Sequence, residues 1–600
     1  MKESKKTKTR EQIDSKYKWN MAAMYADEAI WEKDCAAALK KAESFRAYRG
    51  RLAEGGDILL AAFQAKDEIW QTIERVYVYA RMKRDEDNRV ARYQSMCDKC
   101  NSLIAGASAA MSFFTPELLS IPEEQILKFL KETPGLDLYE FVLRQTLREK
   151  AHVLTAAEEA LLARMGELLS ATGDIFTMIN DADIRFGSIV DEEGDQVEVT
   201  HGRYISLLES KDRRVRREAF EHMYAAYEAQ KNTLATTYNY NTKTDAVGAE
   251  IRHYPSSRAA ALSGGNIPEE VYDNLISVVN KRLRLLHRYV DLRQKALGVD
   301  QVHMYDLYVP VVNKPEDNIP YEKALDLMRE GLAPLGKEYI DTVNQGIQSG
   351  WIDVYENEGK TSGAYSFGSY DSMPYILLNY NNQLKDVFTI VHEMGHSMHS
   401  HYTRKTQPFV YGDHSIFTAE VASTVNENLL MKHLLKKETD PERRKYLLNL
   451  YIEEFRGTLF RQTMFAEFEL LTHQAVEKGE TLTSEWLCAT YLDLNKKYFG
   501  EKVFYDPQIA MEWARIPHFY RAFYVYQYAT GYSAAAAISD LILTGGESAR
   551  ENYIRFLCSG SSDDPIELLK IAGVDMSKPE PIERAIDVFE NLLNELETLI

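Results

Sequence analysis

Residues 387–402, VFTIVHEMGHSMHSHY, contain the pattern H-E-x-x-H, with His392, Glu393 and His396 in its three fixed places. The apolar residues of this stretch recur at helical spacing, so we expect an α-helix. Residues four apart in a helix lie on the same face, one turn above each other. His392 and His396 can therefore bind one metal ion, while Glu393 beside them can reach a water molecule that the metal holds. This arrangement is typical of zinc metalloproteases.

Two histidines do not complete a catalytic zinc site, which takes three protein ligands and keeps one position open. The extended pattern H-E-x-x-H-x-x-G-x-x-H would require Gly at 399 and His at 402. This chain has His399 and Tyr402 there, so that class is excluded. A carboxylate from a second helix is the alternative source of the third ligand. The stretch 415–437, SIFTAEVASTVNENLLMKHLLKK, is predicted to form that helix.

The acidic residues of this second helix are Glu420 and Glu427, seven apart and so on nearly the same face. Glu420 follows His396 by 24 residues, which is enough chain to turn and run the second helix against the first. We expect Glu420 to be the third ligand and Glu427 to orient a ligand histidine. His399 and the nearby histidines are candidates for substrate contact, or else polar surface.

Composition excludes several classes of function. The 600 residues are 45% hydrophobic, enough for a large core, and the formal net charge of −20 argues against nucleic acid as a partner. The basic N-terminus is not followed by an apolar segment, and no run of about 18 uncharged apolar residues occurs, so we expect neither a signal peptide nor a membrane helix. The five cysteines are odd in number and scattered, which favours a cytoplasmic protein with reduced thiols.

Helical periodicity dominates the chain, so a mainly α fold is predicted. The stretch 185–205 alternates in polarity and has an acidic turn at 191–194, which predicts a short β-hairpin. We place the main boundary there, with an N-terminal helical domain in 1–200 and a catalytic domain in 201–600. The basic run 211–217, KDRRVRR, is predicted to be a solvated helix face.

The segment before the H-E-x-x-H helix, 361–386, contains Gly368 and a predicted strand at 375–380. An exposed strand edge beside a peptidase site can pair with an extended peptide through main-chain hydrogen bonds. An ordinary strand of a small sheet is the equal alternative. We therefore expect a small β element beside the helix, with Gly368 and Tyr375 as tentative substrate contacts.

A second candidate cluster occupies 512–534, EWARIPHFYRAFYVYQYATGYSA, which holds His518 and five tyrosines. A zinc hydrolase has to stabilise the oxyanion of its tetrahedral intermediate. Tyrosine hydroxyls and a histidine N–H suit this, because they donate hydrogen bonds without competing for the metal. An aromatic-rich core helix is the alternative for part of the cluster.

The residues at 392–399, HEMGHSMH, fit the pattern H-E-x-G-H-x-x-H, and the chain here resembles the thimet oligopeptidase family of zinc peptidases. TAEVASTVNE resembles the helix of that family that bears the glutamate ligand, which corresponds to Glu420. Four further stretches are similar to the bacterial oligoendopeptidase F branch: YKWNMAAMYADEAIWEKD, YSFGSYDSMPYILLNYNN, WARIPHFYRAFYVYQYATG and NYIRFLCSGSSDDPIELLKIAGVDM. The resemblance covers nearly the whole chain.

The resemblance implies a multi-helical, bowl-like or clamshell zincin-type fold whose helices line one deep channel, with one Zn²⁺ ion. It implies an oligoendopeptidase that cuts short, unfolded peptides internally. His518 corresponds to a histidine that stabilises the oxyanion and binds substrate. The tyrosine spacing differs by about one residue from the mammalian-type enzymes, so Tyr524 and Tyr528 are preferred. Tyr526 and Tyr532 are their rivals and are also tentative substrate contacts.

Two other classes remain open at this point. A zinc exopeptidase on a similar helical scaffold also uses H-E-x-x-H, but needs groups dedicated to one chain terminus. A non-catalytic peptide-binding protein is disfavoured because all four zinc-site residues are present together. Cobalt or manganese can occupy such a site in vitro. We expect peptides as partners, no nucleic acid or membrane, and a monomer or small homo-oligomer.

Overall fold

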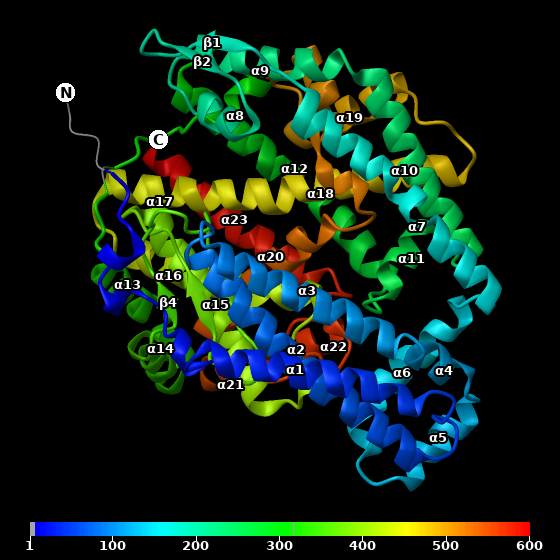
Figure 1. Ribbon diagram of the computed structural model, residues 1–600. Helices are drawn as coiled ribbons and strands as arrows, with labels where there is room; N and C mark the ends of the chain where they lie inside the picture. The colour runs from blue at the N-terminus through cyan, green and yellow to red at the C-terminus, as the bar shows by residue number, and fades with distance from the viewer. Residues whose placement is uncertain (1–5, 316) are drawn as a thin grey trace. The chain divides into compact units, whose positions relative to one another are not determined.

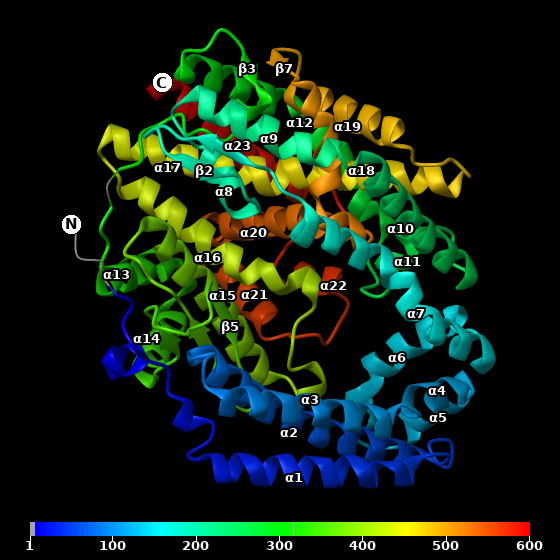
Figure 2. The ribbon, with the colours of Figure 1, turned by 45° about the horizontal axis from the view of Figure 1, so that its top comes forward.

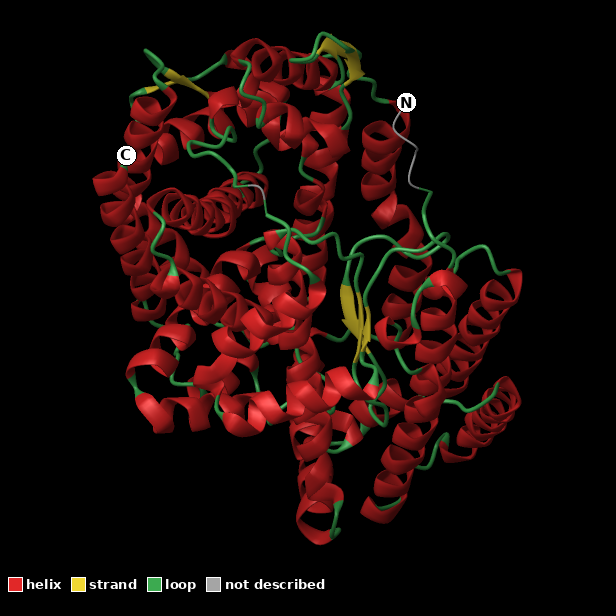
Figure 3. Ribbon diagram, turned by 90° about the vertical axis from the view of Figure 1, so that its left-hand side faces the viewer, coloured by secondary structure: helices red, strands yellow, loops and turns green. Residues whose placement is uncertain are grey.

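The computed structural model describes residues 6–315 and 317–600, and helices account for most of them (Figure 3). The chain divides into two compact units, each assembled from three segments. Unit 1 comprises 1–151, 317–433 and 538–573, and unit 2 comprises 152–316, 434–537 and 574–600. The predicted mainly α fold is confirmed. The division at residue 200 and the bowl-like shape stay predictions.

Unit 1 is built around three long helices, and Figure 1 shows α2 and α3 side by side against α1. One hydrophobic core joins these three helices and includes Leu59, Phe63 and Ile73 of α2. The helices of unit 1 are α1 (Glu28–Ser44), α2 (Gly56–Glu86), α3 (Ala91–Met111), α4 (Phe114–Ser120), α5 (Glu123–Glu132), α6 (Glu140–Glu149), α13 (Tyr321–Leu332), α14 (Lys337–Ser349), α15 (Leu384–Thr406), α21 (Gly546–Leu557) and α22 (Pro565–Ile571).

One stretch of unit 1, Ala91–Ser120, is long and apolar enough by composition to cross a membrane. Its buried side chains in α3, among them Leu103 and Met111, belong to the core shared with α1 and α2. A core helix passes the same test of length and composition, so a single such stretch is weak evidence. The expected absence of a membrane helix stays a prediction.

A three-stranded sheet of unit 1 lies against α15 (Figure 3). Its strand order is β4 (Ile352–Asp353), β6 (Tyr375–Leu377), β5 (Tyr365–Phe367). β6 runs parallel to β4 and antiparallel to β5, with Ser366 opposite Ile376. The small β element beside the H-E-x-x-H helix is therefore confirmed.

Of the two alternatives for the strand at 375–380, the structure supports an ordinary strand of a small sheet. β6 is shorter than predicted and is the central strand, because its two edges pair with β4 and β5. The outer strand that contacts α15 is β5. An edge available to a peptide therefore has to be sought on β5.

Buried ion pairs hold β4 in place at the other edge of the sheet. Asp353 is 2% exposed, and its Oδ2 accepts a hydrogen bond from Arg10 Nη2 at 2.7 Å. The Nζ atom of Lys360, whose side chain is fully buried, lies 2.8 Å from Asp353 Oδ1. The N-terminal arm is thereby attached to the sheet that lies against α15.

Unit 2 is almost entirely helical, and α12 packs against α18, α19 and α23 (Figure 2). α12 follows Pro268 and ends at Gly298, whose φ of 62° suits a helix C-terminus. The helices of unit 2 are α7 (Ala156–Thr177), α8 (His201–Leu208), α9 (Arg213–Glu228), α10 (Lys231–Ile251), α11 (Ser257–Ser263), α12 (Glu269–Leu297), α17 (Pro441–Glu454), α18 (Arg461–Glu477), α19 (Ser484–Phe499) and α23 (Glu580–Leu599). Two further helices, α16 (Ile416–Lys437) and α20 (Tyr526–Thr544), contain the unit boundaries at 433 and 537.

The predicted hairpin of unit 2 is confirmed as β1 (Ser188–Val190) paired antiparallel with β2 (Gln196–Glu198). A second two-stranded sheet pairs β3 (Val302–His303) with β7 (Val503–Phe504). The prediction of a solvated face for the basic run 211–217 is wrong in part. Arg216 is 3% exposed and donates from Nη2 to Asp306 at 2.8 Å, while Arg213 donates to the other oxygen of that carboxylate.

Glu512 links three elements in the interior of unit 2, where it is 3% exposed. Its Oε1 accepts hydrogen bonds from Arg461 (2.8 Å) and Arg515 (3.0 Å), and its Oε2 accepts one from Tyr491 (2.6 Å). Burial alone would raise the pKa of Glu512, but the two guanidinium groups outweigh burial and lower it to about 2. The carboxylate is therefore charged at neutral pH.

The variant Glu512→Gln keeps the size of the side chain but leaves two buried guanidinium groups without a carboxylate. We expect the free energy of unfolding at pH 7 to fall by roughly 3–5 kcal/mol. Because the folded pKa is depressed, the stabilisation is fully present above the ordinary value of 4.5 and is lost as pH falls towards about 2. Urea unfolding followed by circular dichroism should show the gap between the two proteins narrowing across that range.

The exposed Glu501 supplies the control, because Glu501→Gln makes the same change of charge on the surface of the same unit. It should alter the free energy of unfolding by no more than about 0.5 kcal/mol. Equal losses in the two variants, or a gap that stays constant in acid, would contradict the assigned role of Glu512.

Candidate metal centre

Three donor atoms of unit 1, contributed by α15 and α16, lie within 4.8 Å of one another. His392 Nε2 and His396 Nε2 are 3.2 Å apart, and Glu420 Oε2 lies 3.4 Å from the first and 3.5 Å from the second. In a tetrahedral site with bonds of about 2.0–2.1 Å, neighbouring donors are about 3.3 Å apart. The spacing of the three donors therefore fits a tetrahedral metal ion with its fourth position left open.

Gly395 allows α16 to come this close to α15. A Cβ atom at Gly395 would lie 2.5 Å from the Cα of Ser423 and 2.7 Å from the carbonyl oxygen of Ala422. Both of these are backbone atoms of α16, so no flexible side chain could move aside. The glycine inside the H-E-x-x-H pattern thus sets the separation of the two helices, and with it the distance from the histidines to Glu420.

Hydrogen bonds fix the register of α16 against α15. Asn426, which is fully buried, donates from Nδ2 to the carbonyl oxygen of Val391 at 3.2 Å. The hydroxyl of Tyr339 donates to Asn426 Oδ1 at the same distance. Ser423 Oγ lies 3.2 Å from Glu420 Oε2 and donates to it. The sequence analysis missed Asn426. The only signal that the sequence offers for it is an amide side chain about a turn and a half beyond Glu420 on the same predicted helix.

Glu427 lies on the far side of His392. Its Oε2 is 3.3 Å from His392 Nδ1, the ring nitrogen that faces away from the other two donors. A carboxylate in this place fixes the orientation and tautomer of a metal-binding histidine. Burial would lower the pKa of His392, but Glu420 and Glu427 outweigh it and raise the pKa to about 10 when no metal is bound.

Glu393 points to the opposite side of the turn, towards β5. It is 7% exposed, and the backbone N–H of Ser366 in β5 interacts with its carboxylate. Burial raises the pKa of Glu393 above its ordinary value, and the neighbouring His392 and His396 oppose that rise. The Oγ atoms of Ser366 and Ser397 are 2.8 Å apart, which ties β5 to α15. The sequence analysis missed Ser366, because a three-residue strand has no detectable periodicity.

The second predicted cluster forms within unit 2. His518 Nε2 lies 3.2 Å from the hydroxyl of Tyr528, and the rings of His518 and Tyr524 are parallel with centroids 6.1 Å apart. The rings of Tyr524 and Tyr528 meet edge to face at 5.5 Å. Burial, followed by the positive charge of Arg521, lowers the pKa of His518, so its imidazole is neutral at pH 7.

The remaining tyrosines that were predicted as substrate contacts have buried side chains. Tyr375 is 0% exposed and packs against Trp19, and both edges of its strand are paired, so it is not available to a ligand. Tyr526 is 2% exposed with its ring 5.1 Å from that of Tyr272. Tyr532 is 7% exposed and contacts Phe455 edge to face.

His399 is also buried, at 1% exposed, and its ring stacks on that of His414 at 4.3 Å. Burial holds the pKa of His399 well below its ordinary value, so it is neutral. Gly368 follows β5, and a Cβ atom there would come within 2.9 Å of Arg404 Nη1 and 3.1 Å of the carbonyl oxygen of Met373. A larger residue at this position would therefore require Arg404 and the backbone at Met373 to shift.

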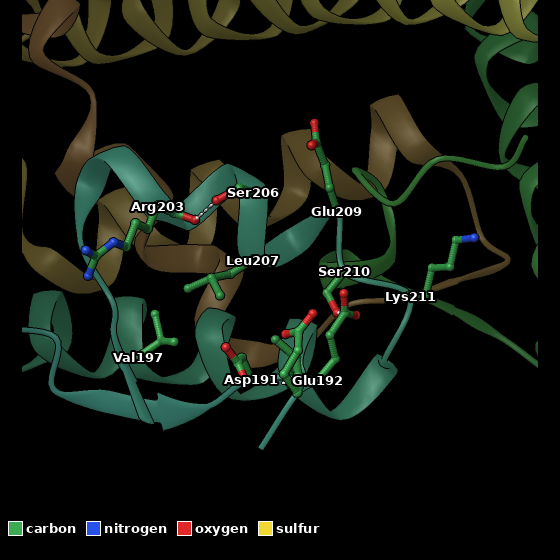
Figure 4. Close-up of a pocket in the computed structure, with 11 residues that line it drawn as sticks. Asp191, Glu192, Val197, Arg203, Ser206, Leu207, Glu209, Ser210 and Lys211 are labelled. Carbon is green, nitrogen blue, oxygen red and sulfur yellow. Dashed lines mark hydrogen bonds between the residues drawn. The ribbon is translucent and has the colours of Figure 1, made fainter. Parts of the chain in front are cut away.

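A pocket of about 520 Å³ in unit 2 lies beside the β1–β2 hairpin and α8, and Figure 4 shows its acidic and basic lining residues. The hydroxyl of Ser210 already donates to Glu192 Oε2 at 2.6 Å. Among the described residues that line this pocket there is no histidine and none of the predicted site residues. It offers no counterpart of the three-donor arrangement at α15 and α16.

Comparisons with known proteins agree along the whole chain. Residues 206–588 match the model of peptidase family M3, and residues 117–186 match the model named Oligopeptidase F. The chain is 48% identical to oligopeptidase PepF of Bacillus subtilis, over 98% of this chain and 88% of that protein.

The chain is also similar to solved structures over nearly its whole length. The chain is 36% identical in sequence to a protein from Chlamydophila abortus. The crystal structure of that protein matches with a TM-score of 0.94 over 99% of this chain and 100% of that chain. Oligoendopeptidase-F from Enterococcus faecium is 41% identical, with a TM-score of 0.73 over 95% and 99% of the two chains.

The variant Gly395→Ala tests how far the metal centre depends on the close approach of α15 and α16. Because the new methyl group meets backbone atoms, we expect α16 to shift and Glu420 to leave its position. The affinity for Co²⁺, followed by its visible absorption during titration, should fall on the order of 10–100-fold.

Gly166→Ala is the matched control, because a Cβ atom at this glycine of α7 meets nothing within 4 Å. It should leave the affinity for Co²⁺ unchanged. Unchanged affinity in Gly395→Ala as well would show that the helix separation does not control the third donor.

Proposed function

The chain belongs to peptidase family M3, and from this premise we propose that it is a zinc-dependent oligoendopeptidase that cuts short, unfolded peptides internally. Peptide-bond hydrolysis follows from the family. The observation that carries the zinc-dependent mechanism is the set of three donors at tetrahedral spacing, with the carboxylate of Glu393 on the next residue of the same helix.

In this proposal His392, His396 and Glu420 hold one Zn²⁺ ion, and Glu427 orients His392. When bound, the ion supplies Lewis-acid chemistry, which acidifies a water molecule and polarises the scissile carbonyl. Two imidazoles and one carboxylate are the donor types that zinc prefers in catalytic sites. The distances between these donors support the assignment.

Glu393 is the general base. It takes a proton from the attacking water and then delivers it to the departing amine, so the same carboxylate serves both halves of the reaction. Its buried position beside the two histidines supports this role, because a carboxylate held away from bulk water keeps a defined orientation.

The peptide backbone is held by the outer edge of β5. The N–H of Ser366 on that strand faces Glu393, so a peptide paired with β5 would run beside the catalytic carboxylate. Gly368 at the end of β5 keeps this edge free of a side chain. In this proposal β5 takes the place of the strand at 375–380, for which an edge that pairs with a peptide was one of two alternatives.

His518 donates a hydrogen bond to the oxyanion, together with Tyr524 or Tyr528. A neutral imidazole and a phenol are donors that do not displace the metal. The hydrogen-bonding distance from His518 to Tyr528 supports the preference for these residues over Tyr526 and Tyr532. A cytoplasmic location belongs to the same proposal, and the free thiols of all five cysteines support it.

An internally quenched peptide with both ends blocked tests the function directly. We expect cleavage that a chelator abolishes and added Zn²⁺ restores, since an exopeptidase requires a free terminus and a peptide-binding protein cleaves nothing. Mass spectrometry of the products should locate an internal cut. Glu393→Gln should keep one metal ion per chain, yet lower kcat on the order of 10²–10⁴-fold, because the base is lost and the ligands remain.

Glu501→Gln serves again as the control for loss of one carboxylate elsewhere, and its kcat should match that of the unmodified protein. The general-base assignment fails if Glu393→Gln cleaves the peptide at a comparable rate with its metal bound.

The two carboxylates of α16 are expected to behave differently towards metal. Glu420→Ala removes a ligand and should leave the purified protein without stoichiometric zinc by mass spectrometry. Glu427→Gln removes only the partner of His392, so we expect zinc to bind on the order of 10–100-fold more weakly but still to full occupancy at saturation. Full occupancy in Glu420→Ala would move the third ligand to another residue.

A further inference from the structure

We propose that Glu469 of α18 is a positioning residue: it fixes the loop 521–525, and through that loop it places His518, Tyr524 and Tyr528. The inference rests on the proposed function, because the role of these three residues is part of that proposal. All of the groups that carry it lie in unit 2.

The loop contains a strained residue. Phe523 has a φ of 51°, a left-handed conformation that an aromatic side chain rarely adopts. Among the described residues, the other non-glycine positions with positive φ are His253, Asn266 and Asn382. Residues that remain in such conformations are held there by their surroundings, and they concentrate at functional sites. The groups that hold Phe523 in this conformation are therefore candidates for a functional role.

Glu469 holds the backbone of Phe523 directly. The N–H of Phe523 donates to Glu469 Oε1 at 2.7 Å, and Glu469 is fully buried. Its other oxygen, Oε2, is also buried and has no hydrogen-bond partner in the described part of the chain. A buried carboxyl group with one oxygen unpaired is costly to maintain. The hydrogen bond from the N–H of Phe523 gives a reason for a carboxyl group at position 469.

Two aromatic rings hold the side chain of Phe523 from the same direction. The ring of His473, one helical turn beyond Glu469, lies 4.6 Å from the Phe523 ring, and that of Tyr272 lies 5.6 Å away. His473 is itself fixed at both nitrogens. Its Nδ1 is 2.8 Å from the carbonyl oxygen of Glu469, and its Nε2 is 3.3 Å from Asp245 Oδ2.

The loop 521–525 connects His518, Tyr524 and Tyr528. His518 precedes it, and the N–H of Arg521 donates to the carbonyl oxygen of His518 at 2.9 Å. Tyr524 is the next residue after Phe523, so the left-handed turn sets the direction of its side chain. Tyr528 follows in the first turn of α20, and its N–H donates to the carbonyl oxygen of Val525 at 3.2 Å. Holding Phe523 therefore constrains all three.

The protonation of Glu469 determines which substitution is conservative. Burial raises its pKa to about 8, although the nearby His473 opposes the rise. The carboxyl group is therefore mostly neutral at pH 7, and glutamine reproduces both its size and an oxygen that accepts from Phe523. Leucine has a similar volume but no acceptor. The pair Glu469→Gln and Glu469→Leu thus isolates the hydrogen bond.

With the end-blocked peptide as substrate, we expect Glu469→Leu to lower kcat on the order of 10²-fold, because small displacements of catalytic groups are costly. KM should change by less than about threefold, and the metal content should stay at one ion per chain. Glu469→Gln should stay within about threefold of the unmodified protein. A purely structural role would instead lower the melting temperature and leave kcat per folded molecule unchanged.

Glu477→Leu is the matched control on the same helix. Glu477 also accepts a backbone hydrogen bond, from the N–H of Ser257 at 2.7 Å, but that residue lies outside the loop. Loss of the Glu477 carboxylate should leave kcat unchanged. If Glu469→Leu does not fold, Glu469→Asp carries the test, because its shorter side chain keeps the carboxyl group but does not reach Phe523. The same loss of kcat is expected.

His518→Ala separates this inference from the proposed function. We expect His518→Ala to lower kcat and the double variant with Glu469→Leu to be no worse, because the two residues act through one cluster. If His518→Ala leaves kcat unchanged, the proposed role of His518 fails and the inference falls with it. If His518→Ala lowers kcat but Glu469→Leu does not, or if the losses multiply, only the positioning role is overturned.

Discussion

At Gly395 the backbones of α15 and α16 are so close that only a hydrogen atom fits between them. The metal centre depends on this contact, because the histidines lie on one helix and Glu420 on the other. Asn426 secures the register by donating to Val391 across the same interface. The sheet then adds Glu393 to the site, since Ser366 and Ser397 join β5 to α15. One steric constraint thus sets the distances among all of these groups.

The donor set could be predicted because it follows local periodicity. His392 and His396 are four residues apart on one helix, and the next predicted helix offered Glu420 and Glu427. The role of β5 could not be predicted in this way. Strands of two or three residues have no detectable alternation, and their order β4-β6-β5 depends on pairings between distant segments. The sequence therefore located the small sheet but left open whether the strand at 375–380 has an exposed edge.

Sequence patterns also did not predict which polar side chains are buried. The run at 211–217 has the composition of a solvated surface, yet Arg216 is buried because Asp306 compensates its charge from a distant segment. Likewise, five tyrosines within thirteen residues resemble one aromatic cluster. In the structure Tyr526 and Tyr532 are buried against Tyr272 and Phe455, whereas Tyr524 and Tyr528 lie beside His518.

The interleaving of the two units has a consequence for biosynthesis. Unit 1 includes the segment 538–573 and unit 2 the segment 574–600, both late in the sequence. The metal donors have all left the ribosome long before either unit can be completed. Contacts of such high sequence separation form slowly and late, so a nascent or truncated chain cannot complete either unit.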